Sequence, residues 1–422
     1  MKVLFIHDKF LQATVCASAG VRLQAPNAGG LPVYLQSVIG TLQARGCSVA
    51  GIRFTTAVQA PVQTAPGFYE MPAARFLPKI ATLRHFWRII EREHPDLVHL
   101  HSAFYAMHPL LLRSLRRSLP VIATFHDVGP LCFWHTKVLP DGSLCSFPVG
   151  PSCLRRGCYR LGARESAVPD LLRVLSSHIY LNGYRSLPAI IVPSGYLREV
   201  LLANGFAAGR VQVVPLFSRY LRAGGELGQA SGPARGEGSI LFVGRLVRQK
   251  GLTDFLEALS RLGSRTWLAR VVGEGEMLEE GRRAVERDRL GARVVFAGRA
   301  SSTELAGHYQ WSRFLVMPSL VPESFGLVGV ESLSFGKPVV AYHAGGVTEW
   351  LQDGVTGFLV RRGEVGELAG RIARLLADEP LRERLGENGR RLVESRFTLE
   401  GHVNRLLEIY AGVLAGAQGS IA

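Results

Sequence analysis

Short apolar runs alternate with longer amphipathic segments along most of this 422-residue chain. Apolar runs of strand length that are separated by segments of helical spacing are typical of a parallel sheet covered by helices on both faces. The first half of the chain has five predicted strands, at residues 3–6, 49–54, 97–100, 121–125 and 190–192. Helices are predicted between them, for example at residues 32–45 and 79–93.

The same alternation restarts after residues 222–238, which are rich in Gly, Ala and Ser. The second half has five further predicted strands, at residues 240–243, 269–272, 294–296, 314–317 and 339–341. The sequence therefore predicts an α/β fold of two doubly wound, Rossmann-like domains that face one another across a central cleft. Ligands are expected at the carboxyl ends of the strands.

We place the domain boundaries where the pattern is interrupted. An N-terminal domain at 1–220 is followed by a linker at 221–238 and a C-terminal domain at 239–398. A polar, turn-rich insertion spans residues 130–165 of the first domain. A last helix at 399–414 follows the natural end of the second domain, and we expect it to pack on the first.

We expect neither a membrane span nor a signal peptide in this chain. No apolar run reaches the ~18 residues that a transmembrane helix needs, and the chain opens directly on a predicted strand. We therefore expect a cytoplasmic protein with mostly reduced cysteines.

The net charge of +15 is unevenly distributed. Residues 1–220 hold 23 Lys and Arg against 10 Asp and Glu, whereas residues 221–422 hold 26 against 24. A basic surface of this kind suits anionic lipid head groups or nucleic acid. Residues 79–93 and 109–117 are candidates for basic, membrane-facing helices. The alternative is that both are core-packed helices with a solvated basic face.

Two carboxylates lie eight residues apart in the second half, at Glu323 and Glu331. We expect Ser324 to cap a helix whose first free N–H groups belong to Phe325, Gly326 and Leu327. A helix start attracts anions because its amides and its dipole point outward. The segment therefore predicts a site for a charged ligand that is rich in hydroxyl groups.

A second candidate site follows the predicted strand 240–243. Gly244 and Arg245 precede Lys250 in a loop bounded by glycines, and an Arg and a Lys at this spacing form a clamp for a diphosphate. A solvated loop is the alternative. Glu274 lies between two glycines after the next strand. Because the chain has no Asp-x-Asp pair of the kind that holds Mg²⁺, we expect no metal in catalysis.

Two further candidates lie in the first half. His126 directly follows the predicted strand 121–125, where its side chain would point into the cleft. Gly29 and Gly30 precede a predicted helix and would let backbone N–H groups approach a ligand. A structural histidine and a plain loop are the respective alternatives.

Four cysteines are clustered in and beside the insertion, at Cys132, Cys145, Cys153 and Cys158. In a reducing compartment such a cluster predicts a structural zinc site. Only one pair has the short spacing of zinc ligands, so four free thiols are the alternative.

Taken together, these residues resemble the family 4 retaining glycosyltransferases of the GT-B fold, also called group 1. The strongest likeness is the Glu-x7-Glu motif of Glu323 and Glu331, followed by the Gly244 to Lys250 loop. Other similar stretches are Pro95-Asp96 with His99, Val192-Pro193-Ser194, and Gly345-Gly346 with Glu349. Many members have Pro-Asn-Gly where this chain has Pro215-Leu216-Phe217, so the contacts of this segment are not implied.

The resemblance implies transfer of a sugar from a UDP- or GDP-sugar to a lipid-linked or glycan acceptor, with retention at the anomeric carbon. It implies that Arg245 and Lys250 hold the diphosphate and that Glu331 binds the ribose. Glu323 would contact the transferred sugar, and His126 would line the sugar site. The implied donor-binding set also includes Gly29, Gly30, Gly244, Glu274, Phe325, Gly326 and Leu327.

We expect a role in cell-envelope or exopolysaccharide synthesis, no catalytic cofactor and no nucleic-acid partner. The alternatives are a sugar-nucleotide epimerase of the same fold and a non-catalytic, membrane-associated relative. The Glu323 and Glu331 pair argues against the epimerase, and the intact loop around Lys250 argues against the non-catalytic relative.

Overall fold

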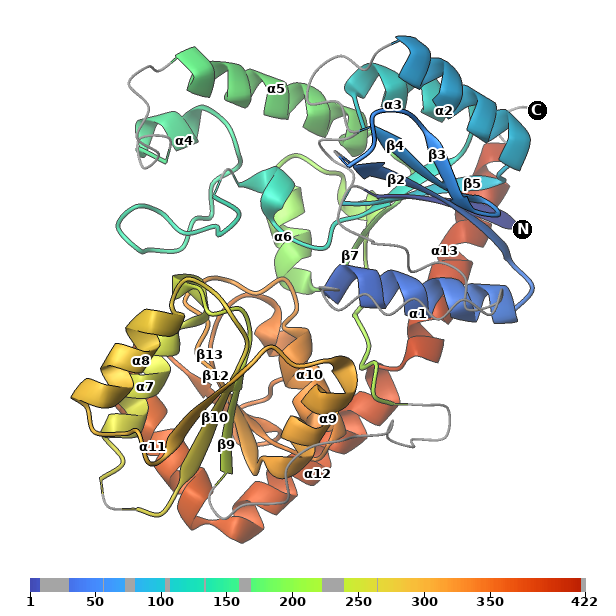
Figure 1. Ribbon diagram of the computed structural model, residues 1–422. Helices are drawn as coiled ribbons and strands as arrows, with labels where there is room; N and C mark the ends of the chain where they lie inside the picture. The colour runs from blue at the N-terminus through green and yellow to red at the C-terminus, as the bar shows by residue number, and fades with distance from the viewer. Residues whose placement is uncertain are drawn as a thin grey trace. The chain divides into compact units, whose positions relative to one another are not determined.

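The computed structural model describes residues 1–7, 30–55, 57–72, 80–102, 107–132, 134–158, 168–221, 239–263 and 265–418. The chain divides into two compact units (Figure 1). Unit 1 comprises Met1–Val214 and His402–Ala422, and unit 2 comprises Pro215–Gly401. Each unit is built on a mainly parallel sheet, so the predicted α/β class with two parallel-sheet domains is confirmed.

The sheet of unit 1 has the order β3-β4-β2-β1-β5-β6-β7-β8, and only the β3–β4 pair is antiparallel. Its strands are β1 (Lys2–His7), β2 (Ser48–Thr55), β3 (Val62–Ala65), β4 (Phe68–Pro72), β5 (Leu97–His101), β6 (Val121–Thr124), β7 (Ile190–Val192) and β8 (Val211–Val213). Its helices are α1 (Gly30–Ala44), α2 (Ile80–Glu93), α3 (Pro109–Ser118), α4 (Pro151–Arg155), α5 (Val168–Arg185), α6 (Gly195–Ala203) and most of α13 (Leu399–Gln418).

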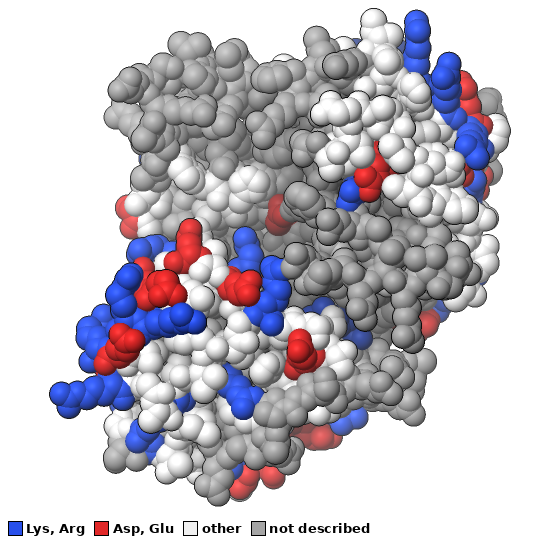
Figure 2. Space-filling view, in the orientation of Figure 1, with Lys and Arg blue, Asp and Glu red and all other residues white. Residues whose placement is uncertain are grey.

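One large apolar core lies between this sheet and helices α2, α3, α5 and α6. Helix α3 buries Leu111, Leu112 and Leu115 in this core, and α2 buries Phe86 and Ile90. Both are therefore core-packed helices. Their opposite faces are basic, and Figure 2 shows Lys and Arg side chains gathered over α2.

The sheet of unit 2 has the order β11-β10-β9-β12-β13-β14 and is parallel throughout. Its strands are β9 (Ser239–Val243), β10 (Leu268–Val272), β11 (Val294–Gly298), β12 (Phe314–Met317), β13 (Val339–Tyr342) and β14 (Gly357–Val360). In chain order this is 3-2-1-4-5-6, the arrangement of dinucleotide-binding folds. The direction of winding reverses between β9 and β12, and ligands of such sheets bind outside the carboxyl ends of the strands at this point.

Two layers of helices cover the sheet of unit 2, with a separate core under each. Helices α7 (Leu252–Ser260), α8 (Leu278–Arg287) and α11 (Val365–Ala377) cover one face. Helices α9 (Ser302–Trp311), α10 (Leu327–Ser334) and α12 (Glu379–Arg396) cover the other. Because both faces of the sheet are covered, β12 and β13 are buried along their whole length, as their uniformly apolar sequences predict.

Polar side chains mark where several helices begin. Ser301 and Glu304 form a reciprocal capping box at α9, in which each side chain bonds the backbone N–H of the other residue. Ser194 accepts a hydrogen bond from the amide of Leu197 at α6, and Asp378 accepts one from Leu381 at α12. These caps satisfy amides that have no partner inside the helix.

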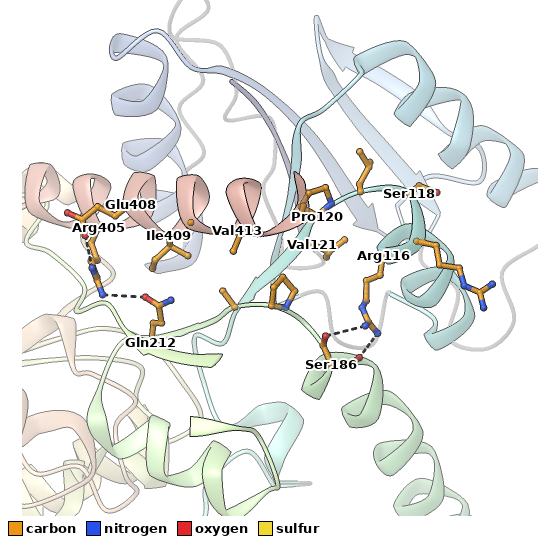
Figure 3. A pocket seen from close by; sticks show the side chains of 17 residues that line it. Arg116, Ser118, Pro120, Val121, Ser186, Gln212, Arg405, Glu408, Ile409 and Val413 are labelled. Atoms are coloured by element: carbon orange, nitrogen blue, oxygen red, sulfur yellow. Dashed lines mark hydrogen bonds and ion pairs between the residues drawn. The ribbon is translucent and has the colours of Figure 1, made fainter. Parts of the chain in front are cut away.

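A groove of about 770 Å³ lies in unit 1 between α13, the end of α3 and the starts of β6 and β7 (Figure 3). Arg116 donates hydrogen bonds to the hydroxyl and the carbonyl of Ser186 on one side of this groove. Arg405 of α13 pairs with Glu408 at 2.6 Å on the other side. Within the described ranges, no helix combines the length and the apolar character that crossing a bilayer requires.

Glycines allow α12 to pack closely on its neighbours in unit 2. A Cβ atom on Gly386 would lie 2.0 Å from the carbonyl oxygen of Gly336, which is fixed backbone. Gly370 on α11 is exposed, and a Cβ atom there would meet nothing within 4 Å. The two positions are therefore a matched pair for testing this contact.

We predict that Gly386→Ala lowers the free energy of unfolding by about 1–3 kcal/mol, because the added methyl group overpacks the interface. Gly370→Ala should raise it by up to about 1 kcal/mol, because Ala is the better helix former. Urea denaturation of the two variants and the unchanged protein checks this. Equal shifts in the same direction would show that α12 does not pack on Gly336 as described.

Candidate functional site

The loops that follow β9 and β12 are held together at the point where the sheet of unit 2 reverses its winding. The amide of Leu320 donates to the carbonyl of Gln249 at 2.8 Å. Gly251 has a φ of +71°, and a Cβ atom there would lie 1.9 Å from the carbonyl oxygen of Pro318. Only glycine satisfies both conditions, so Gly251 lets the two loops approach.

This approach brings Lys250 and Glu323 together. The ammonium group of Lys250 lies 2.5 Å from Oε1 of Glu323, and the hydroxyl of Ser319 donates to the same oxygen at 2.5 Å. The two charged side chains are 26% and 13% exposed. The pair is therefore partly desolvated and still open on one side to a ligand.

The surroundings keep Glu323 ionised. Burial alone would raise its pKa, but the charge and hydrogen bond of Lys250, the hydrogen bond of Ser319 and the charge of Arg245 outweigh it, so the pKa is lowered. Because folding lowers this pKa, ionised Glu323 stabilises the folded state at pH values above the usual pKa of a carboxyl group. This stabilisation is lost as the pH falls through the lowered pKa. Near neutral pH the carboxylate is an acceptor of hydrogen bonds and not an acid.

Arg245 is exposed in the same loop and forms no ion pair with any residue that the structure describes. Its charge acts on Glu323 without direct contact. The loop after β10 packs behind it, since the amide of Leu246 donates to the carbonyl of Glu274 at 2.8 Å. The carboxylate of Glu274 is itself exposed and lies 3.8 Å from Arg299, so it is not part of the Lys250–Glu323 pair.

Helix α10 begins beside Glu323, but not as the sequence predicts. The residue that precedes the helix is Gly326 with a φ of +84°, and no side chain caps it, so the prediction that Ser324 is the cap is wrong. Phe325 is buried, and its carbonyl accepts a hydrogen bond from the indole of Trp350 at 2.6 Å. Among the described residues, the amides of Leu327 and Val328 have no acceptor. The helix therefore presents the amides of Leu327 and Val328 at its start, and of these two the sequence predicts only Leu327.

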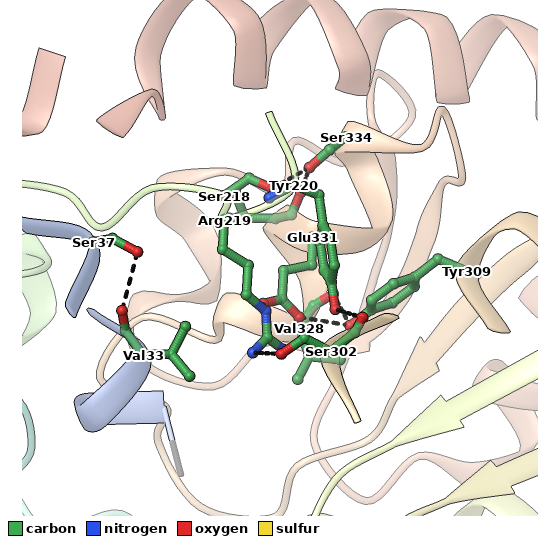
Figure 4. Close-up of polar contacts among 11 residues, drawn as sticks. Val33, Ser37, Ser218, Arg219, Tyr220, Ser302, Tyr309, Val328, Glu331 and Ser334 are labelled. Carbon is green, nitrogen blue, oxygen red and sulfur yellow. Dashed lines mark hydrogen bonds and ion pairs between the residues drawn. The ribbon is translucent and has the colours of Figure 1, made fainter. Parts of the chain in front are cut away.

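Glu331 lies further along α10 and is almost completely buried. Figure 4 shows its contacts with Arg219 and Tyr309. One carboxylate oxygen lies 2.8 Å from Nε of Arg219, and the other accepts a hydrogen bond from Tyr309 at 2.9 Å. Burial would lower the pKa of Arg219, but the charge of Glu331 raises it. Burial and the same charge raise the pKa of Tyr309. Neither Arg219 nor Tyr309 is marked as a partner of Glu331 by any sequence pattern, and the ribose contact of Glu331 stays a prediction.

Unit 1 places His126 just after β6, beside a group of buried rings. Nε2 of His126 lies 3.0 Å from Nδ1 of His101, which ends the neighbouring strand β5. His99 on the same strand bonds the hydroxyls of Tyr410 and Thr124 at 2.7 Å each and is fully buried, as a structural histidine would be. Of the two predicted glycines, Gly30 is the first residue of α1, and Gly29 lies outside the described residues.

The four cysteines of the insertion form no disulfide bond. Burial raises the pKa of Cys153, and the charges of its neighbours Cys145 and Cys132 raise it further. Burial and the same neighbours raise the pKa of Cys158. Within the described part of the chain, no three or more His, Cys, Asp or Glu side chains are arranged to hold a metal ion. The structure gives the zinc prediction no support, and it stays a prediction.

Comparisons with known proteins identify the family of this chain. Residues 28–217 match the family described as Glycosyltransferase Family 4, and residues 226–392 match the family described as Glycosyl transferases group 1. An uncharacterized glycosyltransferase of Methanocaldococcus jannaschii is 32% identical over 170 residues, which are 40% of this chain and 47% of that protein. The chain thus spans about half the length of the first curated relatives that it matches.

Two longer matches extend over nearly the whole chain. The D-inositol 3-phosphate glycosyltransferase of Nocardiopsis dassonvillei is 28% identical over 423 aligned residues, which cover 92% of this chain and 91% of that protein. The structure of Anabaena HepE in complex with UDP has a TM-score of 0.68 at 18% identity, and covers 98% of this chain and 100% of the other. Because the two family matches together account for most of both units, the chain belongs to the group 1, family 4 glycosyltransferases of the GT-B fold.

Proposed function

We propose that this protein transfers a sugar from a nucleoside diphosphate donor to an acceptor, with retention of the anomeric configuration. The observation that carries the proposal is the Lys250–Glu323 pair, which lies beside Arg245 and the free amides of α10. Together these groups place cations, amides and a carboxylate acceptor in two adjoining loops. A sugar diphosphate needs the same three kinds of partner.

The chemistry follows from where charge develops. When the bond between the sugar and the diphosphate breaks, negative charge grows on the leaving diphosphate. Arg245, Lys250 and the amides of Leu327 and Val328 are fixed donors that stabilise such charge without reorganising. No metal ion is needed for this step in our proposal.

The ionised Glu323 has a different role in this proposal. It accepts hydrogen bonds from hydroxyls of the transferred sugar. The ammonium group of Lys250 lies between the carboxylate of Glu323 and the diphosphate, and so reduces the repulsion between these two negative groups. The family resemblance implies further contacts of His126 with the sugar and of Gly29 and Gly30 with the phosphates, and these contacts stay predictions. Glu331 accepts hydrogen bonds from the ribose, because each of its carboxylate oxygens keeps a second lone pair beside Arg219 or Tyr309.

The donor class is a UDP- or GDP-sugar in this proposal. Its support is the likeness of fold to Anabaena HepE, whose structure is a complex with UDP. For the acceptor we propose a lipid-linked or growing glycan, made at an anionic membrane surface during cell-envelope or exopolysaccharide synthesis. The support is the exposed arginines on the solvent-facing sides of α2 and α3. Figure 2 shows Lys and Arg side chains gathered over α2. A structural zinc at the four cysteines also stays a proposal.

Substitutions in the two loops test the catalytic proposal. We expect Arg245→Met and Lys250→Met each to lower kcat/KM by at least about 100-fold, since one removed donor at a developing charge costs about that much. Glu323→Gln should lower it by at least about 10-fold, because it removes a charged acceptor of the sugar hydroxyls and leaves Lys250 without its ion-pair partner. Arg248→Gln is the matched control, because Arg248 is an exposed cation of the same loop with no described partner. Product NMR would report the anomeric configuration. Native rates in all three variants would refute the site.

Donor binding is tested without any acceptor. A donor present at about 100 times its Kd stabilises the folded chain by about 2.7 kcal/mol, so the matching nucleotide sugar should raise the unfolding temperature. We expect a rise with a UDP- or GDP-sugar, and a much smaller one in Lys250→Met. A screen of UDP-, GDP- and ADP-sugars that raises the temperature with none of them would contradict the donor class.

Vesicle binding tests the membrane proposal. Arg84 and Arg88 are exposed on α2, and each arginine near an anionic surface contributes about 1 kcal/mol. Arg84→Gln/Arg88→Gln should therefore weaken binding to phosphatidylglycerol vesicles by roughly 30-fold. The control Arg283→Gln/Arg384→Gln removes two exposed cations from unit 2. Equal loss in both double variants, or binding insensitive to salt, would count against a specific basic face.

A further inference from the structure

The carboxyl ends of β1, β5 and β6 hold a group of packed rings in unit 1. His7, His101 and Thr124 occupy paired positions on these three strands, so the backbone fixes where the group lies. The ring of Phe5 stacks on that of His101 with centroids 5.0 Å apart and an interplanar angle of 15°. The ring of His126 lies beside that of His101, with centroids 5.3 Å apart and an interplanar angle of 26°.

His101 has two ring nitrogens in different situations. Nδ1 lies 3.0 Å from Nε2 of His126, within hydrogen-bonding distance. Nε2 is buried and has no hydrogen-bond partner among the residues that the structure describes. The pKa of His101 is held well below its usual value by burial and by the neighbouring histidines His99, His126, His7 and His402. The ring therefore carries one proton, on one of the two nitrogens.

The position of that proton follows from the unpartnered nitrogen. A proton on Nε2 would be a buried N–H donor without an acceptor, an arrangement that folded proteins rarely contain. A proton on Nδ1 is instead donated to His126, and leaves only a lone pair at Nε2. His101 is thus the donor in the bond, and Nε2 of His126 is the acceptor.

We propose that His101 is a positioning residue, which by donating from Nδ1 confines the single proton of His126 to Nδ1 of that ring. Nε2 of His126 is then committed to His101 and unavailable as a base. The single N–H of the His126 ring is then at Nδ1. His126 can therefore donate a hydrogen bond only from Nδ1.

The catalytic consequence rests on the proposed function, but the proton position does not. If His126 contacts the transferred sugar, its Nδ1–H donates to an oxygen of that sugar. It does not remove a proton from the acceptor. An imidazole that is free to exchange tautomers would offer this donor for only part of the time, and the lost preorganisation would slow transfer.

Nitrogen NMR of the histidine rings tests the proton position directly. The full-length chain is labelled with ¹⁵N-histidine, and the rings of His126 and His101 are assigned by comparison with His126→Gln and His101→Asn. We expect Nε2 of His126 to have the ¹⁵N chemical shift of an unprotonated ring nitrogen, and Nδ1 to have that of a protonated one. A protonated Nε2 on His126 in the unchanged protein overturns the proposal, whatever any variant does.

Two substitutions at His101 separate positioning from packing. His101→Phe keeps a ring to stack on Phe5 but removes the donor, whereas the side-chain amide of His101→Asn places an N–H close to the position of Nδ1. In His101→Phe we expect His126 to show a mixture of tautomers and kcat to fall about tenfold, with a smaller change in KM. His101→Asn should restore the single tautomer and most of the lost rate.

The results distinguish this proposal from the proposed function. An unchanged His126 spectrum and an unchanged kcat in folded His101→Phe would overturn the positioning role. The predicted spectrum in a protein that transfers no sugar from any donor would leave the positioning role standing and refute the proposed function. Circular dichroism of each variant confirms that the compared chains are folded.

Discussion

The ion pair between Lys250 and Glu323 is the interaction on which the candidate site depends. It exists because the winding of the second sheet reverses between β9 and β12, which places the two following loops side by side. The close backbone approach at Gly251 then shortens the gap until a lysine reaches a carboxylate. In the free protein each charge satisfies the other. In the proposed function, the phosphates of the ligand bind Lys250 and its hydroxyls bind Glu323. Until the ligand binds, the ion pair holds both side chains in position.

Much of the fold could be predicted because the central strands are buried on both faces and are uniformly apolar. The predicted limits of β7 and β12 are those observed. The strands that the pattern did not reveal are β3, β4, β8 and β14. Each is five residues or fewer, and β3 and β8 lie at the two edges of their sheet. An edge strand such as β3 is mostly exposed, so its conformation comes from pairing with its neighbour and not from an apolar run of its own.

The candidate site was predictable to the extent that its residues follow strands. Lys250 and Glu323 each come a few residues after a buried strand, and parallel strands bring such positions to one edge. Arg219 and Tyr309 could not be found in this way. Arg219 reaches Glu331 from the segment before residues 222–238, and Tyr309 reaches it from α9. The chain has 49 Lys and Arg residues, and no local sequence pattern indicates which of them pairs with Glu331. The prediction that Ser324 caps α10 was wrong for a similar reason. The helix starts from a left-handed backbone conformation at Gly326, where no side chain accepts a hydrogen bond from the first amides.

The contact of Arg219 with Glu331 also determines how the chain can be divided. Arg219 precedes residues 222–238, whose composition resembles that of a linker, yet its side chain neutralises a carboxylate inside unit 2. The hydroxyl of neighbouring Ser218 bonds that of Ser334 at 2.6 Å, and its amide donates to the carbonyl of Phe397. A second unit expressed from residue 239 onward would therefore lose part of its own interior. It would leave Glu331 as an unpaired buried charge, at a cost of about 3–5 kcal/mol. The natural point of separation lies before Pro215, where the compact unit itself begins.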